Sequence, residues 1–221
     1  MRNALLMEFI GSLFLIIAAI SPIILFYETM GAHIGIALLA NAISVAFVLC
    51  ALIEIALPIS GAHFNPVVTL AKTLEQQTGL KKAVLYVVCQ VTGGLAGIAL
   101  THLMFFEKFG GIFFISEVER SGSIFFSEML STFILIFVIL MLGHPNVKSK
   151  RAAFIVAFLV GGMVMATSST FFANPQVTFA RIFTSSASGI QPADALVFIA
   201  MQIVGAVLAF SVYKVFAPVK S

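Results

Sequence analysis

Two short segments of this chain repeat one another, and neither is long enough to cross a membrane. Residues 61–72 read GAHFNPVVTLAK and residues 172–181 read FANPQVTFAR. Each places Asn-Pro before a short apolar helical pattern, with the Val-Thr-x-Ala of 68–71 in register with that of 177–180. In a strongly hydrophobic chain, a duplicated broken helix predicts a pore at the membrane midplane between two inverted repeats.

The composition places almost the whole chain in a bilayer. Hydrophobic residues make up 61% and charged residues 10% of the 221 residues, and the mean hydropathy is +1.13. Soluble domains carry about 25% charged residues. A helix needs about 20 apolar residues to span a bilayer. Stretches of this length lie at 4–26, 34–57, 82–104, 124–143, 152–171 and 194–216.

The distribution of cations predicts how the chain is oriented. One set of span ends carries Arg2, Lys72, Lys81, Lys82, Lys148, Lys150, Arg151, Lys214 and Lys220. The opposite ends carry Lys108 and Arg120 among several acidic residues. Because Lys and Arg gather on the cytoplasmic side, both termini are expected there. The net charge of +3 reflects this anchoring, and no aromatic-basic groove or zinc spacing indicates nucleic-acid binding.

The repeat extends into the long spans. Spans 1 and 4 each open with a glutamate, Glu8 and Glu128, and spans 3 and 6 each carry Gln-x-x-Gly, at Gln90 and Gln202. Each half therefore has three spans and one half-helix, so the second half must enter the membrane inverted. We expect an all-α membrane protein, residues 1–221 in a single channel domain, with repeats at 1–110 and 120–221. It would have six transmembrane helices and two re-entrant half-helices in an inverted 3+3 repeat.

On these residues the chain resembles the major intrinsic protein family, the aquaporins and aquaglyceroporins. The resemblance covers essentially the whole chain and is carried by SGAHFNPVVT at 60–69, the second Asn-Pro and the paired glutamates and glutamines. It implies that the half-helices meet end to end, and it implies a homotetramer, here in a bacterial inner membrane, without a cofactor. The pore motifs would be Asn65-Pro66-Val67 and Asn174-Pro175-Gln176, where Val67 and Gln176 depart from the usual alanine.

Each motif residue also has a physical interpretation. Proline suits the first helical position, where its missing N–H costs nothing. Asparagine caps the helix with its side-chain oxygen and offers amide N–H donors to the pore. Both helix N-termini would then bring partial positive charge to the pore centre. Such a site favours a passing neutral molecule and repels cations and protons.

The buried polar groups have two interpretations. Glu8 and Glu128 could serve transport chemistry such as a proton relay, or each could bond the irregular backbone of its half-helix loop. The resemblance favours the structural role, and Gln90 and Gln202 are interpreted in the same way. His63, with no second ligand nearby, is expected to be a packing residue and not a metal ligand. The span glycines, including Gly93 and Gly205, are expected at close helix crossings.

The family places its selectivity filter at four positions that are fixed by their distance from the two asparagines. These positions carry Val45, Gly162, Phe171 and Val177. Gly162 and Phe171 match the glycerol-conducting branch, whereas Val177 stands where nearly all members have arginine. We expect a wide, apolar filter. Arg181 lies one turn beyond Val177; it either balances the C-terminal end of the half-helix dipole or guards the outer mouth of the pore.

The expected function is therefore passive diffusion of water and small uncharged solutes, similar in size to glycerol or urea, and not enzymatic catalysis. A channel for a metalloid such as arsenite, a neutral trihydroxide, is an alternative because similar channels carry a valine after the second motif. A secondary transporter would need a further carboxylate at the midplane. Glu54 is the only remaining carboxylate within a span, and we favour the interpretation that its side chain reaches the water at the membrane surface. A junction or structural protein is the remaining alternative.

Overall fold

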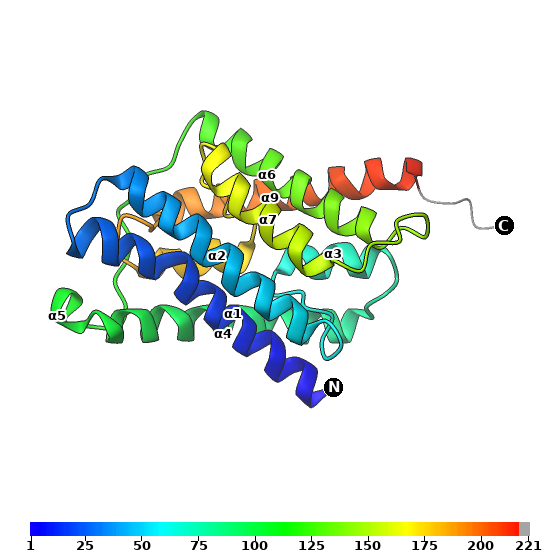
Figure 1. Ribbon diagram of the computed structural model, residues 1–221, viewed down its shortest axis with the longest axis horizontal. Helices are drawn as coiled ribbons and strands as arrows, with labels where there is room; N and C mark the ends of the chain where they lie inside the picture. Colours follow the sequence, from blue (N-terminus) through cyan, green and yellow to red (C-terminus); the bar gives the residue numbers. More distant parts are fainter. Residues whose placement is uncertain (217–221) are drawn as a thin grey trace.

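The computed structural model describes residues 1–216, and within them the chain is built from helices and loops without strands (Figure 1). Lys220, one of the predicted inner cations, lies outside the described residues. The elements are α1 (Arg2–Pro22) with a π-helical continuation (Ile23–Thr29), α2 (Ile34–Ala56), α3 (Pro66–Leu74), α4 (Leu80–Met104), α5 (Phe106–Phe109), α6 (Ser123–Leu142), α7 (Ala152–Ala166), α8 (Pro175–Ala180) with a 3-10 turn (Arg181–Phe183), and α9 (Pro192–Phe216).

The long helices match the predicted spans, with one difference. Five of them are long and apolar enough to cross a membrane, and α7 is a shorter apolar helix. The sequence predicted a span over 152–171, but α7 ends at Ala166. Thr170 and Phe171 have φ angles of 58° and 53°, which break a right-handed helix. The start of α1 and the end of α9 lie at the same end of the molecule (Figure 1).

Two helix pairs form the scaffold, and they correspond between the repeats. α1 packs along α4, and α6 packs along α9. At the first crossing, a Cβ atom on Gly93 would collide with the backbone oxygen of Phe9. At the second, a Cβ atom on Gly205 would collide with the backbone oxygen of Met129. The predicted close crossings at these two glycines are confirmed.

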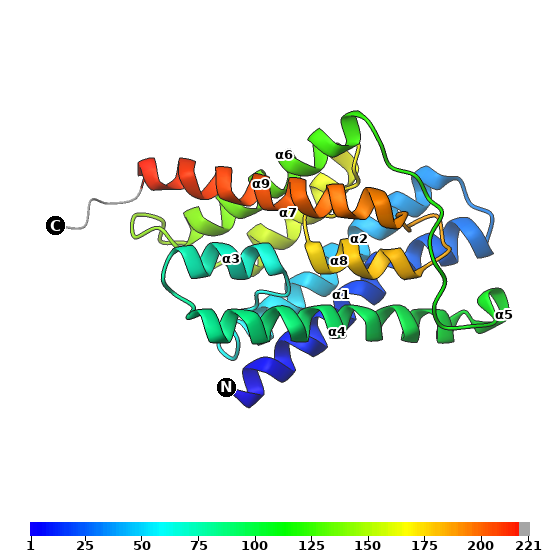
Figure 2. The ribbon, with the colours of Figure 1, turned by 180° about the vertical axis from the view of Figure 1, so that it is seen from behind.

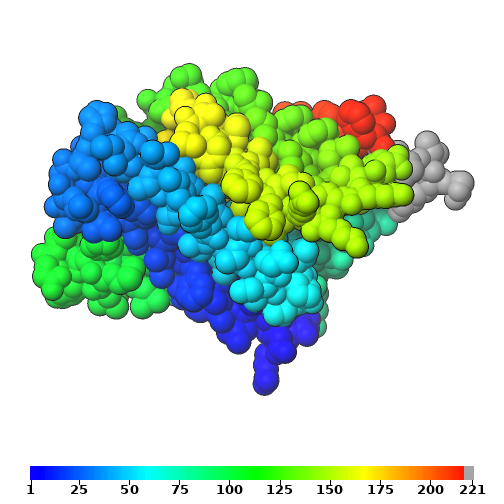
Figure 3. All heavy atoms as spheres, viewed as in Figure 1, coloured from blue at the N-terminus to red at the C-terminus, as the bar shows by residue number. Residues whose placement is uncertain are grey.

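The half-helices lie inside this scaffold. In Figure 2, α3 and α8 lie between α4 and α9 and point in opposite directions from the middle of the molecule. We call the end towards which α3 runs the α3 end, and the opposite end the α8 end. On the other face α2 packs along α7, and Figure 3 shows the two side by side. The architecture is the predicted inverted repeat with two re-entrant half-helices.

The two re-entrant loops share an unusual backbone. In the first, the φ angles of Gly61, Ala62 and Phe64 are 94°, 52° and 47°. In the second, Thr170, Phe171 and Ala173 have φ angles of 58°, 53° and 46°. Left-handed backbone is uncommon for residues other than glycine, and here it occurs at the same three distances before each asparagine. This left-handed backbone turns each segment sharply, so that Asn65 and Asn174 lie in the middle of the molecule.

Candidate functional site

The two asparagines tie the half-helices together. The side-chain oxygen of Asn65 accepts from the N–H of Val67 at 3.0 Å, and that of Asn174 accepts from the N–H of Gln176 at 3.1 Å, so each caps its own helix. The amide of Asn65 donates to the carbonyl of Ala173 at 2.8 Å. The amide of Asn174 donates to the carbonyl of Phe64 at 2.9 Å. Since an amide carries two N–H donors, each asparagine keeps one for another partner.

A narrow cavity of about 80 Å³ runs past both asparagines. By the criterion that one water needs about 10–15 Å³ of such space, it has room for several waters. Its wall is mostly apolar, and α1, α2, α6, α7, the re-entrant loops and the half-helices contribute to it. The valines in the wall are Val45, Val68, Val156, Val160, Val164 and Val177. Its polar members are Asn41, His63, Asn65, Thr170, Asn174 and Arg181.

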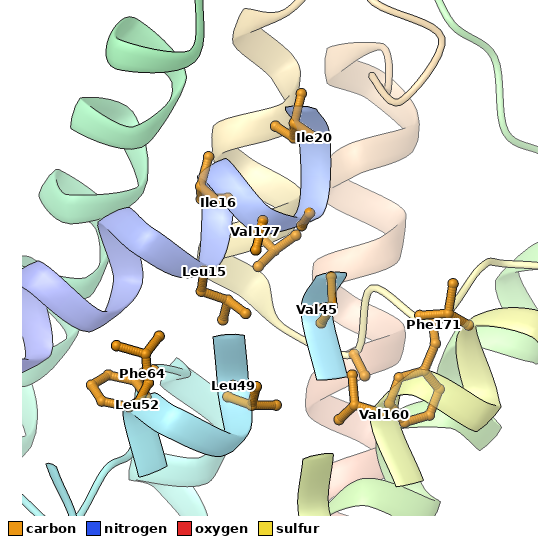
Figure 4. Close-up of a cluster of buried hydrophobic side chains, with 14 of the residues drawn as sticks. Leu15, Ile16, Ile20, Val45, Leu49, Leu52, Phe64, Val160, Phe171 and Val177 are labelled. Atoms are coloured by element: carbon orange, nitrogen blue, oxygen red, sulfur yellow. The ribbon is translucent and has the colours of Figure 1, made fainter. Parts of the chain in front are cut away.

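Three of the four expected filter residues lie in this wall, and one does not. Val45, Phe171 and Val177 are buried and line the cavity. Gly162 is exposed, and a Cβ atom on it would meet nothing within 4 Å. On α7 the wall is formed by Val156, Val160 and Val164; Figure 4 shows Val160 together with Val45 and Phe171.

The expectation for Gly162 is therefore not met, for a geometric reason. Val160 and Val164 are four residues apart and share one face of α7, whereas Gly162 is two residues from each, about 200° around the helix. Valine side chains stand where a glycine would have left room. The cavity wall at this level is apolar, but the extra room that a glycine would leave is absent.

His63 is hydrogen-bonded within the cavity wall. Its Nδ1 lies 3.0 Å from the hydroxyl of Thr69, and its ring meets the ring of Tyr86 edge to face at 5.2 Å. Among residues 1–216, no group of three or more His, Cys, Asp or Glu side chains is placed to hold a metal ion. The surroundings of His63 are those of a packed histidine.

The carboxylate of Glu8 is fully buried and surrounded by donors. One oxygen accepts from the hydroxyl of Ser60 at 2.6 Å and from the N–H of His63 at 3.0 Å. The other accepts from the N–H of Phe64 at 2.7 Å and from the amide of Gln90 at 2.8 Å. Two of these four donors are backbone groups of the first re-entrant loop, where neither helix nor strand would otherwise satisfy them.

Glu128 occupies the equivalent place but has fewer partners. One of its oxygens accepts from the N–H of Ala173 at 2.5 Å and from the amide of Gln202 at 2.6 Å. The other oxygen is buried without a hydrogen bond of good geometry, although the Ser169 hydroxyl also lies near this carboxylate. The two repeats therefore place a glutamate in the same position, but Glu8 accepts more hydrogen bonds than Glu128.

Thr69 and Thr178 complete the support, and the sequence reasoning gave them no role. The amide of Gln90 donates to the hydroxyl of Thr69 at 3.1 Å, and that of Gln202 donates to the hydroxyl of Thr178 at 2.8 Å. The signal was available, because these threonines are the shared members of the Val-Thr-x-Ala repeat. Their side chains tie each half-helix to the span that carries its glutamine.

The third motif residues and Glu54 lie away from the cavity. Val67 is buried and packs in the cluster around α3, α6 and α9. Gln176 is buried, with no hydrogen-bond partner for either side-chain atom. A Cβ atom on Gly94 would collide with the Gln176 side-chain oxygen, so this glycine makes the room for the amide. Glu54 is exposed on α2, on a face other than that of Val45.

Replacing each glutamate by glutamine is expected to destabilise the protein more at Glu8 than at Glu128. In Glu8→Gln the new amide N–H₂ must face donors at one of the two oxygens, whereas in Glu128→Gln it can occupy the unpartnered side. We expect Glu8→Gln to lower the free energy of unfolding by about 1–3 kcal/mol and Glu128→Gln by clearly less. Thermal unfolding in detergent, with solute flux measured on the same preparations, checks this. Loss of flux in a variant of undiminished stability would instead indicate transport chemistry.

Comparisons with known proteins agree with this geometry. The sequence model of the major intrinsic protein family matches residues 1–173. Aquaglyceroporin AqpS of Rhizobium meliloti (strain 1021) is 35% identical over 204 residues, which cover 90% of this chain and 84% of that protein. The probable aquaporin PIP2-8 of Arabidopsis thaliana is 26% identical over 155 residues, and the match spans 54% of its length.

A solved structure gives the fold independently of close sequence similarity. The X-ray structure of the aquaglyceroporin from Plasmodium falciparum superposes with a TM-score of 0.72 and 20% identity, covering 96% of this chain and 95% of that one. The fold, the paired half-helices and the family match lead to one assignment. The chain is a multi-pass integral membrane protein that belongs to the major intrinsic protein family.

Proposed function

We propose that this protein is a membrane channel through which water and small uncharged solutes, similar in size to glycerol or urea, diffuse passively. The observation that carries the proposal is the cavity that runs past both half-helix caps, with two asparagine amides in an apolar wall. The family membership and the aquaglyceroporin relative support the same class of function. A channel, and not an enzyme, is what this family implies.

The geometry suggests how a solute would pass. A polar molecule that loses water on entering needs replacement hydrogen bonds. The second amide N–H of Asn65 and of Asn174 can supply them at the midpoint, and the valine walls on either side hold the molecule only weakly. Conduction requires binding that is strong enough to admit the solute and weak enough to release it. Glu8 and Glu128 would act through the loops, by holding both asparagines in place.

The residues of the cavity wall also bear on two alternative functions, a metalloid channel and a coupled transporter. A neutral metalloid hydroxide such as arsenite would be a second solute, favoured by Val177, which places neither charge nor donor in the wall. A coupled transporter is disfavoured, because the described part of the cavity wall contains no carboxylate and Glu54 lies outside it. We further propose that both termini are cytoplasmic, that the protein resides in a bacterial inner membrane, and that it assembles as a homotetramer, as the family resemblance implies.

Proteoliposomes test the proposed function. Under an osmotic gradient, purified protein is expected to give glycerol and urea permeabilities above those of empty vesicles, without saturation and without an ion gradient. Rapid water flux with glycerol and urea at the level of empty vesicles would contradict the solute class. Flux that needs an ion gradient would contradict a channel altogether.

A further inference from the structure

The helix α1 is irregular where it passes the α8 end of the cavity. Pro22 closes its α-helical part, and Ile23–Thr29 continue with π-helical hydrogen bonding. Because proline has no N–H, the carbonyl of Ala18 lacks its usual helical donor. The N–H of Ile23, which a regular helix would direct to Ala19, donates instead to the carbonyl of Ile20 at the end of α1. π-Helical irregularities are frequent at functional sites.

The two carbonyls released by this irregularity accept hydrogen bonds from other elements. Nη2 of Arg181 donates to the carbonyl of Ala19 at 3.0 Å, and Nη1 donates to that of Ser188 at 3.3 Å. In the amide orientation that satisfies both of its polar atoms, Asn41 on α2 donates to the carbonyl of Ala19 at 3.0 Å and to that of Ala18 at 3.3 Å. The break in α1 therefore fixes one cationic and one amide side chain side by side.

Both side chains belong to the cavity wall. Arg181 and Asn41 are only 5% and 4% exposed, and both line the cavity that also contains Val177. The guanidinium carbon of Arg181 lies 4.0 Å from the ring centre of Phe172, which steadies its orientation. The Nε of Arg181 is buried without a hydrogen-bond partner. Each terminal nitrogen of the guanidinium carries a second N–H, so Arg181 keeps donors beyond those given to Ala19 and Ser188.

We propose that Arg181 and Asn41, anchored on the released carbonyls of α1, form a docking site for solutes at the α8 end of the cavity, one helical turn beyond Val177. The inference rests on the proposed channel function and names its solute class: small uncharged molecules that present acceptor oxygens, such as polyols and ureas. Arg181 supplies the donors that Val177 lacks, because both N–H groups of Asn41 are already given to the carbonyls of Ala19 and Ala18. Its fixed charge, held among apolar walls, also excludes cations.

Hydrogen-bond donation to solutes and exclusion of cations can be tested separately by substitution at Arg181. Arg181→Met keeps much of the side-chain length and the packing on Phe172 but removes every donor and the charge. Arg181→Lys keeps a positive charge but loses the planar fork of donors. Asn41→Leu removes the amide and leaves Arg181 in place. Proteoliposomes of each variant, checked for monodispersity in detergent, are assayed for water flux, glycerol flux and K⁺ leak.

A matched control is available at Arg120. Its guanidinium carbon lies 4.7 Å from the centre of the same Phe172 ring, and its Nε donates to the carbonyl of Gly189 at 3.1 Å, but it does not line the cavity. Arg120→Met therefore removes an equal charge and the same type of ring contact from outside the cavity. It is expected to change neither the glycerol-to-water ratio nor the K⁺ leak.

The expected results are specific to each variant. Arg181→Met should lower the glycerol-to-water ratio several-fold and raise K⁺ leak roughly tenfold or more, because a fixed charge nearby no longer repels the ion. Arg181→Lys and Asn41→Leu should lower the ratio without raising the leak.

Three results would overturn the docking site. The first is an unchanged ratio and leak in well-folded Arg181→Met, and the second is an equal change in Arg120→Met. If Arg181→Met does not fold, an unchanged ratio in both Arg181→Lys and Asn41→Leu is the third. Failure of the proposed function would show separately, as absence of glycerol flux in the unmodified protein.

Discussion

Alanine at Gly93 or at Gly205 is expected to destabilise the protein severely, with little or no folded channel recovered. At either position the new methyl group would collide with a backbone oxygen of the partner helix, that of Phe9 or that of Met129. Backbone cannot move aside as a flexible side chain does, so α1 and α4, or α6 and α9, must separate along their crossing. We expect a loss of at least about 3 kcal/mol of unfolding free energy, the upper part of the range for overpacked cores.

Thermal unfolding in detergent and the yield of monodisperse protein measure this loss. Gly162→Ala is the matched control, because Gly162 also lies in a helix but has open space where its Cβ would be. It should leave flux unchanged and keep or slightly raise the stability, because alanine favours a helix over glycine by about 0.5–1 kcal/mol. Equal stability of Gly93→Ala and Gly162→Ala would show that the helices do not cross as described.

Arginine at Val177 is expected to shift conduction strongly from glycerol towards water. Val177 is buried in the cavity wall, four residues before Arg181 on the same short helical segment. The longer, charged side chain would fill part of the cavity that Phe171 also lines and would add donors to its wall. Since one extra methylene group already changes selectivity by about 10–200-fold in a tight apolar pocket, we expect the glycerol-to-water ratio to fall at least roughly tenfold.

The comparison with Val177→Met separates bulk from charge. Methionine adds length without charge, so its effect on the ratio should be smaller than that of arginine. Stopped-flow light scattering on proteoliposomes of matched protein content gives both permeabilities. An unchanged ratio in well-folded Val177→Arg would contradict the position of Val177 in the permeation path.

Most of the fold could be predicted from the sequence, because the bilayer imposes simple rules. Six apolar stretches, two Asn-Pro half-helices and paired glutamates leave few arrangements in which the backbone is satisfied. The predicted end of span 5 was wrong because the span was drawn through Thr167-Ser168-Ser169-Thr170, a polar run that follows the apolar helix and belongs to the re-entrant loop. The left-handed turn at Thr170 and Phe171 precedes the hydrogen bond from the N–H of Ala173 to Glu128, a contact between residues 45 positions apart that no local pattern reveals.

The candidate site was less predictable than the fold. Val45, Phe171 and Val177 could be placed by counting from the asparagines, but Gly162 could not. The helix α7 is apolar on every face, since one face meets the cavity and others meet lipid or neighbouring helices. Such a helix carries no periodicity that marks its cavity side. Counting back from Asn174 assumes a fixed loop length, and an error of two residues turns the helix by about 200°.

Asn41 illustrates a different limit. A single asparagine in a span is visible in the sequence, but its partners are carbonyls of α1 that become available only because Pro22 interrupts that helix. The interaction depends on the tertiary arrangement of two spans and on a local break in one of them. The same holds for the burial of Arg181, which sequence reasoning could place only at the end of a half-helix.

The central claim is that solutes pass through the cavity walled by Val160 and Val164, and thiol blocking at α7 tests it most directly. In a background with Cys50 and Cys89 replaced by serine, Val164→Cys and Gly162→Cys place a thiol on opposite faces of the same helix. A bulky thiol reagent should abolish glycerol flux through the Val164→Cys protein and leave flux through the Gly162→Cys protein unchanged. The account would be contradicted if the reagent blocked glycerol flux through the Gly162→Cys protein but left flux through the labelled Val164→Cys protein unchanged.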